Sequence, residues 1–157
     1  MKKLATLLMF SLFFASTAFS AEDKIELSSG QTVYVAIYSN VFTGPKERPF
    51  NLTATLSIRN TDLHNKIDVF SVEYFDNNGQ SLKEYTQKPF TLSPLASHHF
   101  SIKEKDEAGG FGANFIVRWK AAKEVNPPII ESVMIGAKSG QGISFVSQGK
   151  VIAEETK

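Results

Sequence analysis

The 157-residue chain has no cysteine, which excludes disulfides, thiolate nucleophiles and cysteine metal ligands. Net charge is also nearly absent. The 17 basic and 16 acidic side chains leave +1, so the composition gives no indication of nucleic acid or an anionic membrane surface as a partner. Beyond residues 1–20, no ten-residue stretch follows the period of an α-helix. These absences favour a β-rich domain held by its hydrophobic core, which 13 Phe, 4 Tyr and 1 Trp can supply.

Residues 1–20 have the layout of a secretory signal peptide. Lys2 and Lys3 precede an apolar run over 4–14, and small residues follow it. The alternative is an uncleaved membrane anchor, although the run is shorter than the ~20 apolar residues that span a bilayer. We therefore predict a periplasmic or secreted protein with residues 21–157 as a single domain and no membrane insertion after cleavage.

The expected cleavage position follows Ser20. Ala18 and Ser20 are then the two small residues that the signal peptidase requires. Cleavage after Ala21 would instead put the bulky Phe19 at one of those positions. The predicted mature chain begins at Ala21.

The clearest pattern in the chain lies between Arg48 and Asp62, where apolar and polar residues alternate. Successive side chains of a β-strand point to opposite faces, so a period of two predicts a strand with one buried face. The predicted buried residues are Leu52, Ala54, Leu56 and Ile58. An antiparallel sheet with one face in water accounts for this pattern.

Short strands and turn signals fill the rest of the chain. The further predicted strands are 32–38, 67–76, 81–85, 97–104, 113–121, 129–136 and 143–147. The inward residues of 67–76 are expected to be Phe70, Val72 and Tyr74. Segment 22–31 reads as a lead-in, 89–94 as either an edge strand or an extended connection, and 154–157 as frayed. Strands spaced this way indicate a β-sandwich or a barrel.

The span from Leu52 to Ile102 resembles immunoglobulin-like modules of secreted bacterial proteins. The resemblance rests on the strand ending in Asn-Thr-Asp, the following strand ending in Tyr-Phe-Asp, and the Asn-Gly hairpin signal after it. It implies an all-β fold: a single immunoglobulin-like antiparallel β-sandwich of about 7–9 strands. Such a fold hosts many functions and implies no activity.

A longer set of segments resembles an uncharacterised bacterial secreted family, domain of unknown function 3124. The segments are RPFNLTATLSIRNTD, GANFIVRW (Gly112 to Trp119), VMIG (Val133 to Gly136) and QGISF (Gln141 to Phe145). The resemblance implies a secreted compartment and one domain. It implies no catalytic residue and no cofactor.

The histidines do not form a metal-binding pattern. His98 and His99 are neighbours on a predicted strand, so they point to opposite faces, and His64 lies in a distant turn. We interpret all three as surface residues. No metal-ligating residue and no cofactor is predicted.

Catalytic and phosphate-binding motifs are also missing from the sequence. Gly109-Gly110-Phe111-Gly112 leads into a strand rather than a helix, so it is interpreted as a connection and not as a phosphate cradle. Gly140-Gln141-Gly142-Ile143-Ser144 has the wrong order for a nucleophile elbow. No catalytic residue is therefore predicted, although a carboxylate pair assembled across the fold would leave no local motif.

The loops indicate where a partner would bind. If consecutive strands alternate in direction, connections 39–49, 77–80, 105–112 and 137–142 emerge at one glycine-rich end. The predicted contact residues there are Phe42, Arg48, Asp106, Phe111 and Gln141. An aromatic side chain in such a loop either plugs the end of the sandwich or contacts a ligand. A full strand at 89–94 would reverse the count and separate these loops.

The sequence thus favours a non-catalytic interaction or accessory module of the cell envelope, with an unknown envelope protein or glycan as its partner. Two other classes stay open. One is a small envelope hydrolase or carbohydrate-active protein with a site built from loops, for which a deep pocket with converging acids would be the mark. The other is a carrier of a metal or small ligand.

Overall fold

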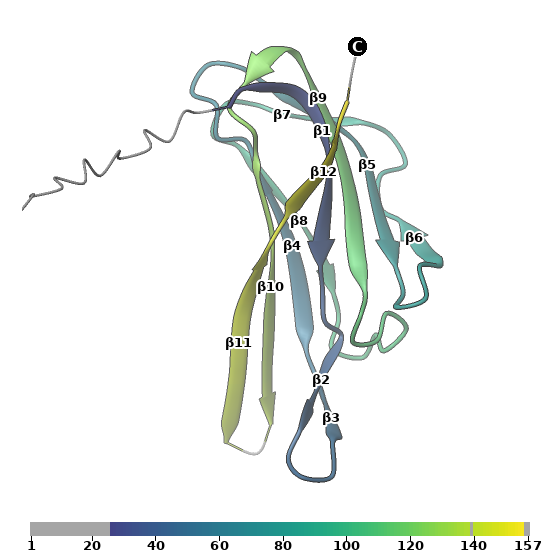
Figure 1. Cartoon of the computed structure of the whole chain (residues 1–157). Helices are drawn as coiled ribbons and strands as arrows, with labels where there is room; N and C mark the ends of the chain where they lie inside the picture. The colour runs from purple at the N-terminus through teal and green to yellow at the C-terminus, as the bar shows by residue number, and fades with distance from the viewer. Residues whose placement is uncertain (1–25, 139, 156–157) are drawn as a thin grey trace, which may run out of the picture.

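The computed structural model describes residues 26–138 and 140–155, so the predicted signal peptide lies outside the described residues. Twelve strands and no helix occur within those ranges, and accordingly no helix there could cross a membrane. The strands form two antiparallel sheets and one separate hairpin (Figure 1). The protein is an all-β sandwich-like fold and not a closed barrel. The finer immunoglobulin-like assignment stays a prediction.

Two sheets face each other across the core. The six-stranded sheet has the order β12 (Lys150–Glu154), β1 (Ser28–Ala36), β9 (Asn114–Val125), β5 (Ile67–Phe75) and β6 (Ser81–Glu84), with β7 (Phe90–Leu92) also paired to β5. The four-stranded sheet has the order β11 (Gln141–Gln148), β10 (Ile129–Lys138), β4 (Thr53–Arg59) and β8 (Ser97–Ile102). The hairpin consists of β2 (Asn40–Thr43) and β3 (Arg48–Asn51).

The core confirms the alternation read from the sequence. The four predicted inward residues around β4, from Leu52 to Ile58, are fully buried. Facing them from β9 are Phe115, Val117 and Trp119, also fully buried. Burial of such side chains, at about 25 cal/mol per Å² of apolar surface, is what holds a domain without disulfides together.

Three expectations about individual strands were wrong. β1 begins at Ser28 inside the predicted lead-in, and β12 reaches Glu154, where fraying was expected. A bulge between Val69 and Ser71 turns the half-buried Phe70 away from the core, because the extra residue shifts the register. The strand count also exceeds the expected 7–9.

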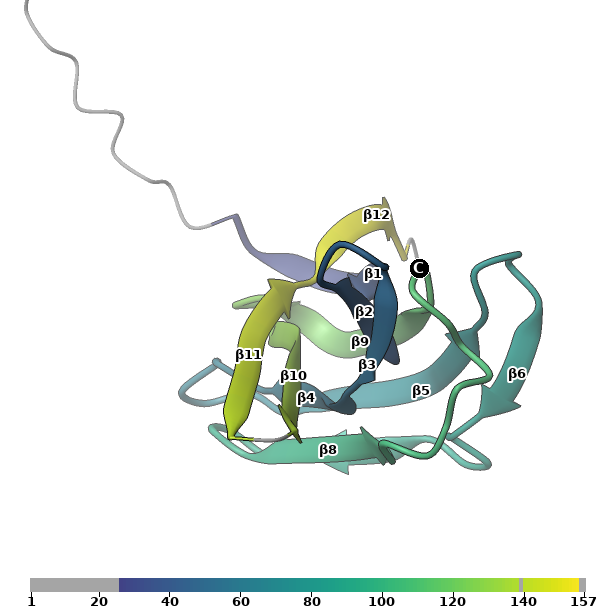
Figure 2. The ribbon, with the colours of Figure 1, turned by 90° about the horizontal axis from the view of Figure 1, so that it is seen from below.

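The connections nevertheless sort to the ends as predicted, even though β7 is a strand. β6 and β7 both pair antiparallel with β5, so they run in the same direction and add no reversal. The hairpins β2–β3 and β10–β11 both project at the lower end of Figure 1. Figure 2 views the molecule from that end.

Candidate functional site

Four aromatic rings gather at the lower end of the sandwich. The rings of Phe42 and Phe111 lie 6.0 Å apart, Phe111 and Tyr38 lie 5.1 Å apart edge to face, and Tyr38 and Phe145 lie 5.4 Å apart. Tyr38 and Phe145 pack against the core, whereas Phe42 and Phe111 are 57% and 51% exposed. We call these four residues the aromatic end.

The chain holds Phe111 in place through the loop 103–113. The amide of Ser39 donates to the carbonyl of Gly110 at 3.1 Å, and Asn51 Nδ2 donates to Glu107 Oε1 at 2.7 Å. These bonds tie the loop to the segments on either side of the β2–β3 hairpin. Phe111 is therefore presented on a connected scaffold and not on a free loop.

The glycines around Phe111 are explained by close packing. A Cβ on Gly109 would lie 1.9 Å from the hydroxyl of Tyr74, and one on Gly110 would lie 2.2 Å from Oδ1 of Asn77. Gly110 also has a φ of +70°, which side chains disfavour. The glycines of this connection therefore have a structural reason. Only glycine lets the loop approach β5 and the turn after it so closely.

Of the five predicted contact residues, the structure brings two into contact. Phe42 and Phe111 come together, although their segments are far apart in sequence. Arg48 is exposed at the same end, lining a hollow of about 390 Å³ with Thr43, to which it is paired. Paired residues of an antiparallel ladder share a face, so Arg48 projects from the face of the hairpin opposite to Phe42.

Asp106 and Gln141 lie in connections at the same end, and the ring contacts of the aromatic end do not involve them. Asp106 is half-buried, and its charge adds to the burial that raises the pKa values of Tyr74 and Tyr85. Gln141 begins β11 opposite Lys138. Their place at the lower end agrees with the loop count, and their role as contacts stays a prediction.

Sequence reasoning missed Tyr38 and Phe145 as members of the cluster. Both were assigned to strands or strand ends and so were interpreted only as structure. The available signal was their position, because Tyr38 directly precedes connection 39–49 and Phe145 lies three residues after connection 137–142. Two aromatic residues beside loops that already held Phe42 and Phe111 could have completed the group.

The opposite end of the sandwich is joined by polar side chains, which the sequence did not single out. The side-chain amide of Asn60 donates to the carbonyls of Asn65, Leu92 and Ser93 at 2.8–3.2 Å. The carboxylate of Asp62 accepts from the amides of three loop residues, namely His64, Asn65 and Asn126.

The pKa of Asp62 is lowered to about 2, and the largest cause is the hydrogen bond from the His64 amide. Connections 61–66, 86–96 and 122–128 are thus joined through two buried residues, Asn60 and Asp62. We call this end the polar end.

A hollow of about 490 Å³ lies on the outer face of the six-stranded sheet. It is lined by Asp68, Phe70, Lys120 and Glu155, among others. Both carboxylates already have hydroxyl donors: Thr91 donates to Asp68 at 2.5 Å, and Thr32 donates to Glu155. The acids are therefore held by neighbouring strands and do not stand free in the hollow.

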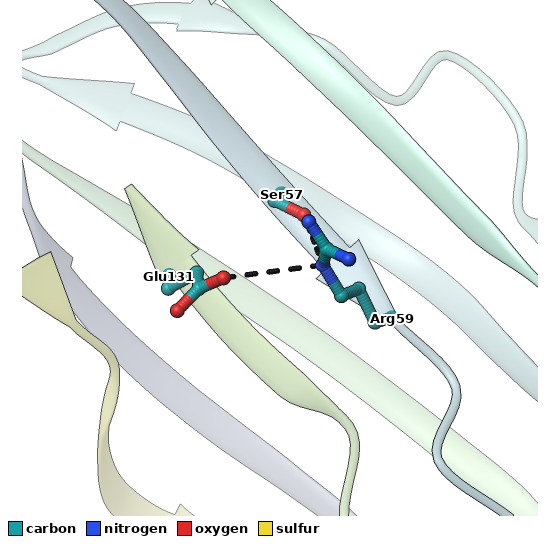
Figure 3. Close-up of polar contacts among 3 residues, drawn as sticks. All are labelled: Ser57, Arg59 and Glu131. Carbon is teal, nitrogen blue, oxygen red and sulfur yellow. Dashed lines mark hydrogen bonds and ion pairs between the residues drawn. The ribbon is translucent and has the colours of Figure 1, made fainter. Parts of the chain in front are cut away.

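The outer face of the four-stranded sheet carries one ion pair. Arg59 Nε lies 3.9 Å from Glu131 Oε1 and donates to Ser57 Oγ at 3.1 Å (Figure 3). The Arg59 side chain is 58% exposed, so this pair adds little to stability.

Across the part of the chain that the structure describes, no three histidine, aspartate or glutamate side chains group as a metal site. His98 instead lies against the rings of Phe90 and Phe100, 4.8 Å from each.

The comparisons with known proteins settle the family. The family model described as "Protein of unknown function (DUF3124)" matches residues 30–152. The chain belongs to this family. Among solved structures, the crystal structure of Thermotoga maritima 1070 is similar at 10% identity and a TM-score of 0.48, over 80% of this chain and 97% of that one. No curated protein matches.

Proposed function

We propose that this member of the DUF3124 family is a non-catalytic interaction module of the cell envelope, and that it binds an envelope protein or glycan at the aromatic end. The observation that supports the proposal most is the exposure of Phe42 and Phe111 side by side. Aromatic rings contribute large apolar contact areas and are enriched at binding surfaces. Loops that carry such rings on a rigid sandwich are common binding sites.

The hydrolase alternative has weaker support. The hollow on the outer face of the six-stranded sheet offers Asp68 and Glu155, but each is engaged by a threonine hydroxyl from an adjacent segment. A general acid or base needs to reach the substrate's proton in hydrogen-bond geometry. The interaction role needs no such rearrangement, because the aromatic end is exposed as it stands.

Binding is tested by capture from envelope extract with immobilised protein. We expect the wild-type protein to retain a partner that the Phe42→Ser/Phe111→Ser variant retains at least about tenfold less well, since anchor aromatic residues at interfaces cost well over 1 kcal/mol when truncated. Leu63→Ser is the matched control, because Leu63 is 62% exposed in connection 61–66 at the opposite end. Equal capture by all three proteins would contradict the proposal.

Localisation in the envelope is proposed from the signal-like residues 1–20. We expect the protein recovered from the periplasm or medium to begin at Ala21, and an intact-mass measurement decides this. Recovery of the chain in the membrane with residues 1–20 retained would contradict it.

A further inference from the structure

β11 is the longest edge strand and the least protected one among the described residues. At the two ends of the six-stranded sheet the edge strands carry charge: β12 contains Lys150 and Glu154, and β6 contains Lys83 and Glu84. The three-residue β7 lies between Pro89 and Pro94, and β8, the opposite edge of the four-stranded sheet, is two residues shorter than β11. Residues 139–149 contain no charged side chain and no proline. Natural edge strands are normally short or carry charged residues or proline, because an unpaired edge is a template for another strand.

The position of β11 leaves this edge accessible. β11 pairs with β10 over its full length, from Gln141 to Gln148. Figures 1 and 2 both place it at the margin of the molecule, with β10 on one side and no described element alongside the other. The strand is eight residues long and has no register shift, so it presents a regular ladder.

The direction of its backbone groups follows from one hydrogen bond. The amide of Gly149 donates to the carbonyl of Ile130 at 2.8 Å, which makes that pair a hydrogen-bonded one. Bonded and non-bonded pairs alternate along an antiparallel ladder. The odd residues of β11 therefore bond to β10. The even residues direct their amides and carbonyls outward; these are Gly142, Ser144, Val146 and Gln148.

The outward groups are complementary to themselves. We propose that the protein forms a two-fold dimer in which β11 pairs antiparallel with β11 of a second copy, centred on Phe145. Gly142 then lies opposite Gln148 of the second copy, and Ser144 opposite Val146. Every outward amide meets an outward carbonyl in this register, and a two-fold axis closes the assembly without leaving a further edge at the contact.

The side chains agree with this register. Val146 and Ile135 are 55% and 57% exposed on the outer face of the sheet. In the proposed dimer, Val133 and Val146 of one copy lie in the same cross-strand row as Ser144 and Ile135 of the second copy. The exposed apolar patches of the two copies are thereby joined. Like charges are not opposed, because the strand has none. The dimer does not depend on binding at the aromatic end.

The mass of the secreted protein in solution is the first test, measured by light scattering or sedimentation. We expect two chains per particle for the wild-type protein, and a single chain up to millimolar concentration would overturn the proposal. Ser144→Pro removes an outward amide without removing a bond to β10, so it is expected to give a folded monomer. A folded Ser144→Pro dimer would overturn the proposal.

A second variant tests the same contact in case the proline variant does not fold. Ser144→Lys with Val146→Lys keeps every amide and places lysines opposite each other across the axis. We expect dimer dissociation to rise at least about tenfold, since like charges directly opposite destabilise a sheet. Thr53→Lys with Thr55→Lys is the control, because these residues share the outer face but lie on β4, inside the sheet. Equal dissociation of the two variants would overturn the proposal.

Cross-linking tests the register, and the absence of native cysteine removes background. Ser144→Cys and Val146→Cys are made as separate proteins. Only directly opposed residues reach the ~4.4–6.8 Å Cα separation of a disulfide. We therefore expect the mixed proteins to cross-link and each protein alone to stay uncross-linked. Cross-linking of either protein alone would overturn the proposed pairing. The absence of cross-linking in the mixture would also overturn it.

Discussion

The two ends of the sandwich are built from opposite chemistry. At the polar end, Asn60 and Asp62 are buried and use their side chains to bind the backbone of neighbouring loops. At the aromatic end, Phe42 and Phe111 touch each other and remain half-exposed. At the polar end the side chains of Asn60 and Asp62 are engaged in hydrogen bonds, whereas the aromatic end leaves apolar surface in water. Apolar surface left in water is unfavourable, and a partner that covered it would recover that free energy. This asymmetry supports the proposal that binding takes place at the aromatic end.

Removing the central amide of the polar end should have the largest effect. Asn60→Ala is expected to lower the free energy of unfolding by about 2–4 kcal/mol, because the carbonyls of three residues lose the donor that joins them. Urea melts measure this. The control is Asn78→Ala, an exposed residue in the β5–β6 turn, expected to cost under about 1 kcal/mol. Equal losses of unfolding free energy in the two variants would show that the Asn60 hydrogen bonds do not stabilise the fold.

The aromatic end should be sensitive where its loop meets the core. Gly109→Ala is expected to cost about 1–3 kcal/mol, because the new Cβ overlaps the hydroxyl of the buried Tyr74 and overpacking displaces the loop. Gly44→Ala is a useful comparison, since a Cβ there meets no atom within 4 Å and only its positive φ of 71° resists the change. A Gly109→Ala cost no greater than that of Gly44→Ala would contradict the packing argument.

Acid should weaken the polar end selectively. Hydrogen bonds from loop amides lower the pKa of Asp62 to about 2 from an ordinary value of 3.8. Because the pKa is lower in the folded state, this stabilisation is complete above pH 3.8 and is lost as the pH falls towards 2. Asp62→Asn should therefore be less stable than wild type at pH 7 and should lose less stability between pH 5 and 2. Parallel stability curves would contradict this.

The sequence predicted what depends on local periodicity. The alternation around Leu56 was enough to assign a buried face, and turn residues such as Gly79 marked the hairpins. Phe42 and Phe111 were placed at one end by counting strand reversals, and the count held because β7 repeats the direction of β6. These inferences needed no knowledge of tertiary contacts.

What escaped prediction depends on contacts between distant segments. β12 pairs with β1 across the whole length of the chain, and its residues show no distinctive pattern alone. The bulge at Phe70 is a property of the β5–β9 ladder, where the buried positions change from Ile67 and Val69 to Val72 and Tyr74. Asn60 and Asp62 resemble ordinary turn residues in the sequence, because some of their partners, such as Leu92 and Asn126, lie more than 30 positions away.

The smallest effect, and the sharpest test of the contrast, concerns the two exposed rings. Phe42→Ala and Phe111→Ala should each lower the free energy of unfolding by about 1 kcal/mol, well below the 3–5 kcal/mol typical of a buried phenylalanine, since each ring is already half in water. The 6.0 Å contact should appear in a double-mutant cycle as a coupling of about 0.5 kcal/mol.

Phe115→Ala, at a fully buried ring, is the control and should show the full core cost. Large single costs with strong coupling at Phe42 and Phe111 would mean that the two rings plug the end of the sandwich. Small costs would mean that the rings contribute little to the fold, which is the condition that a binding surface has to meet.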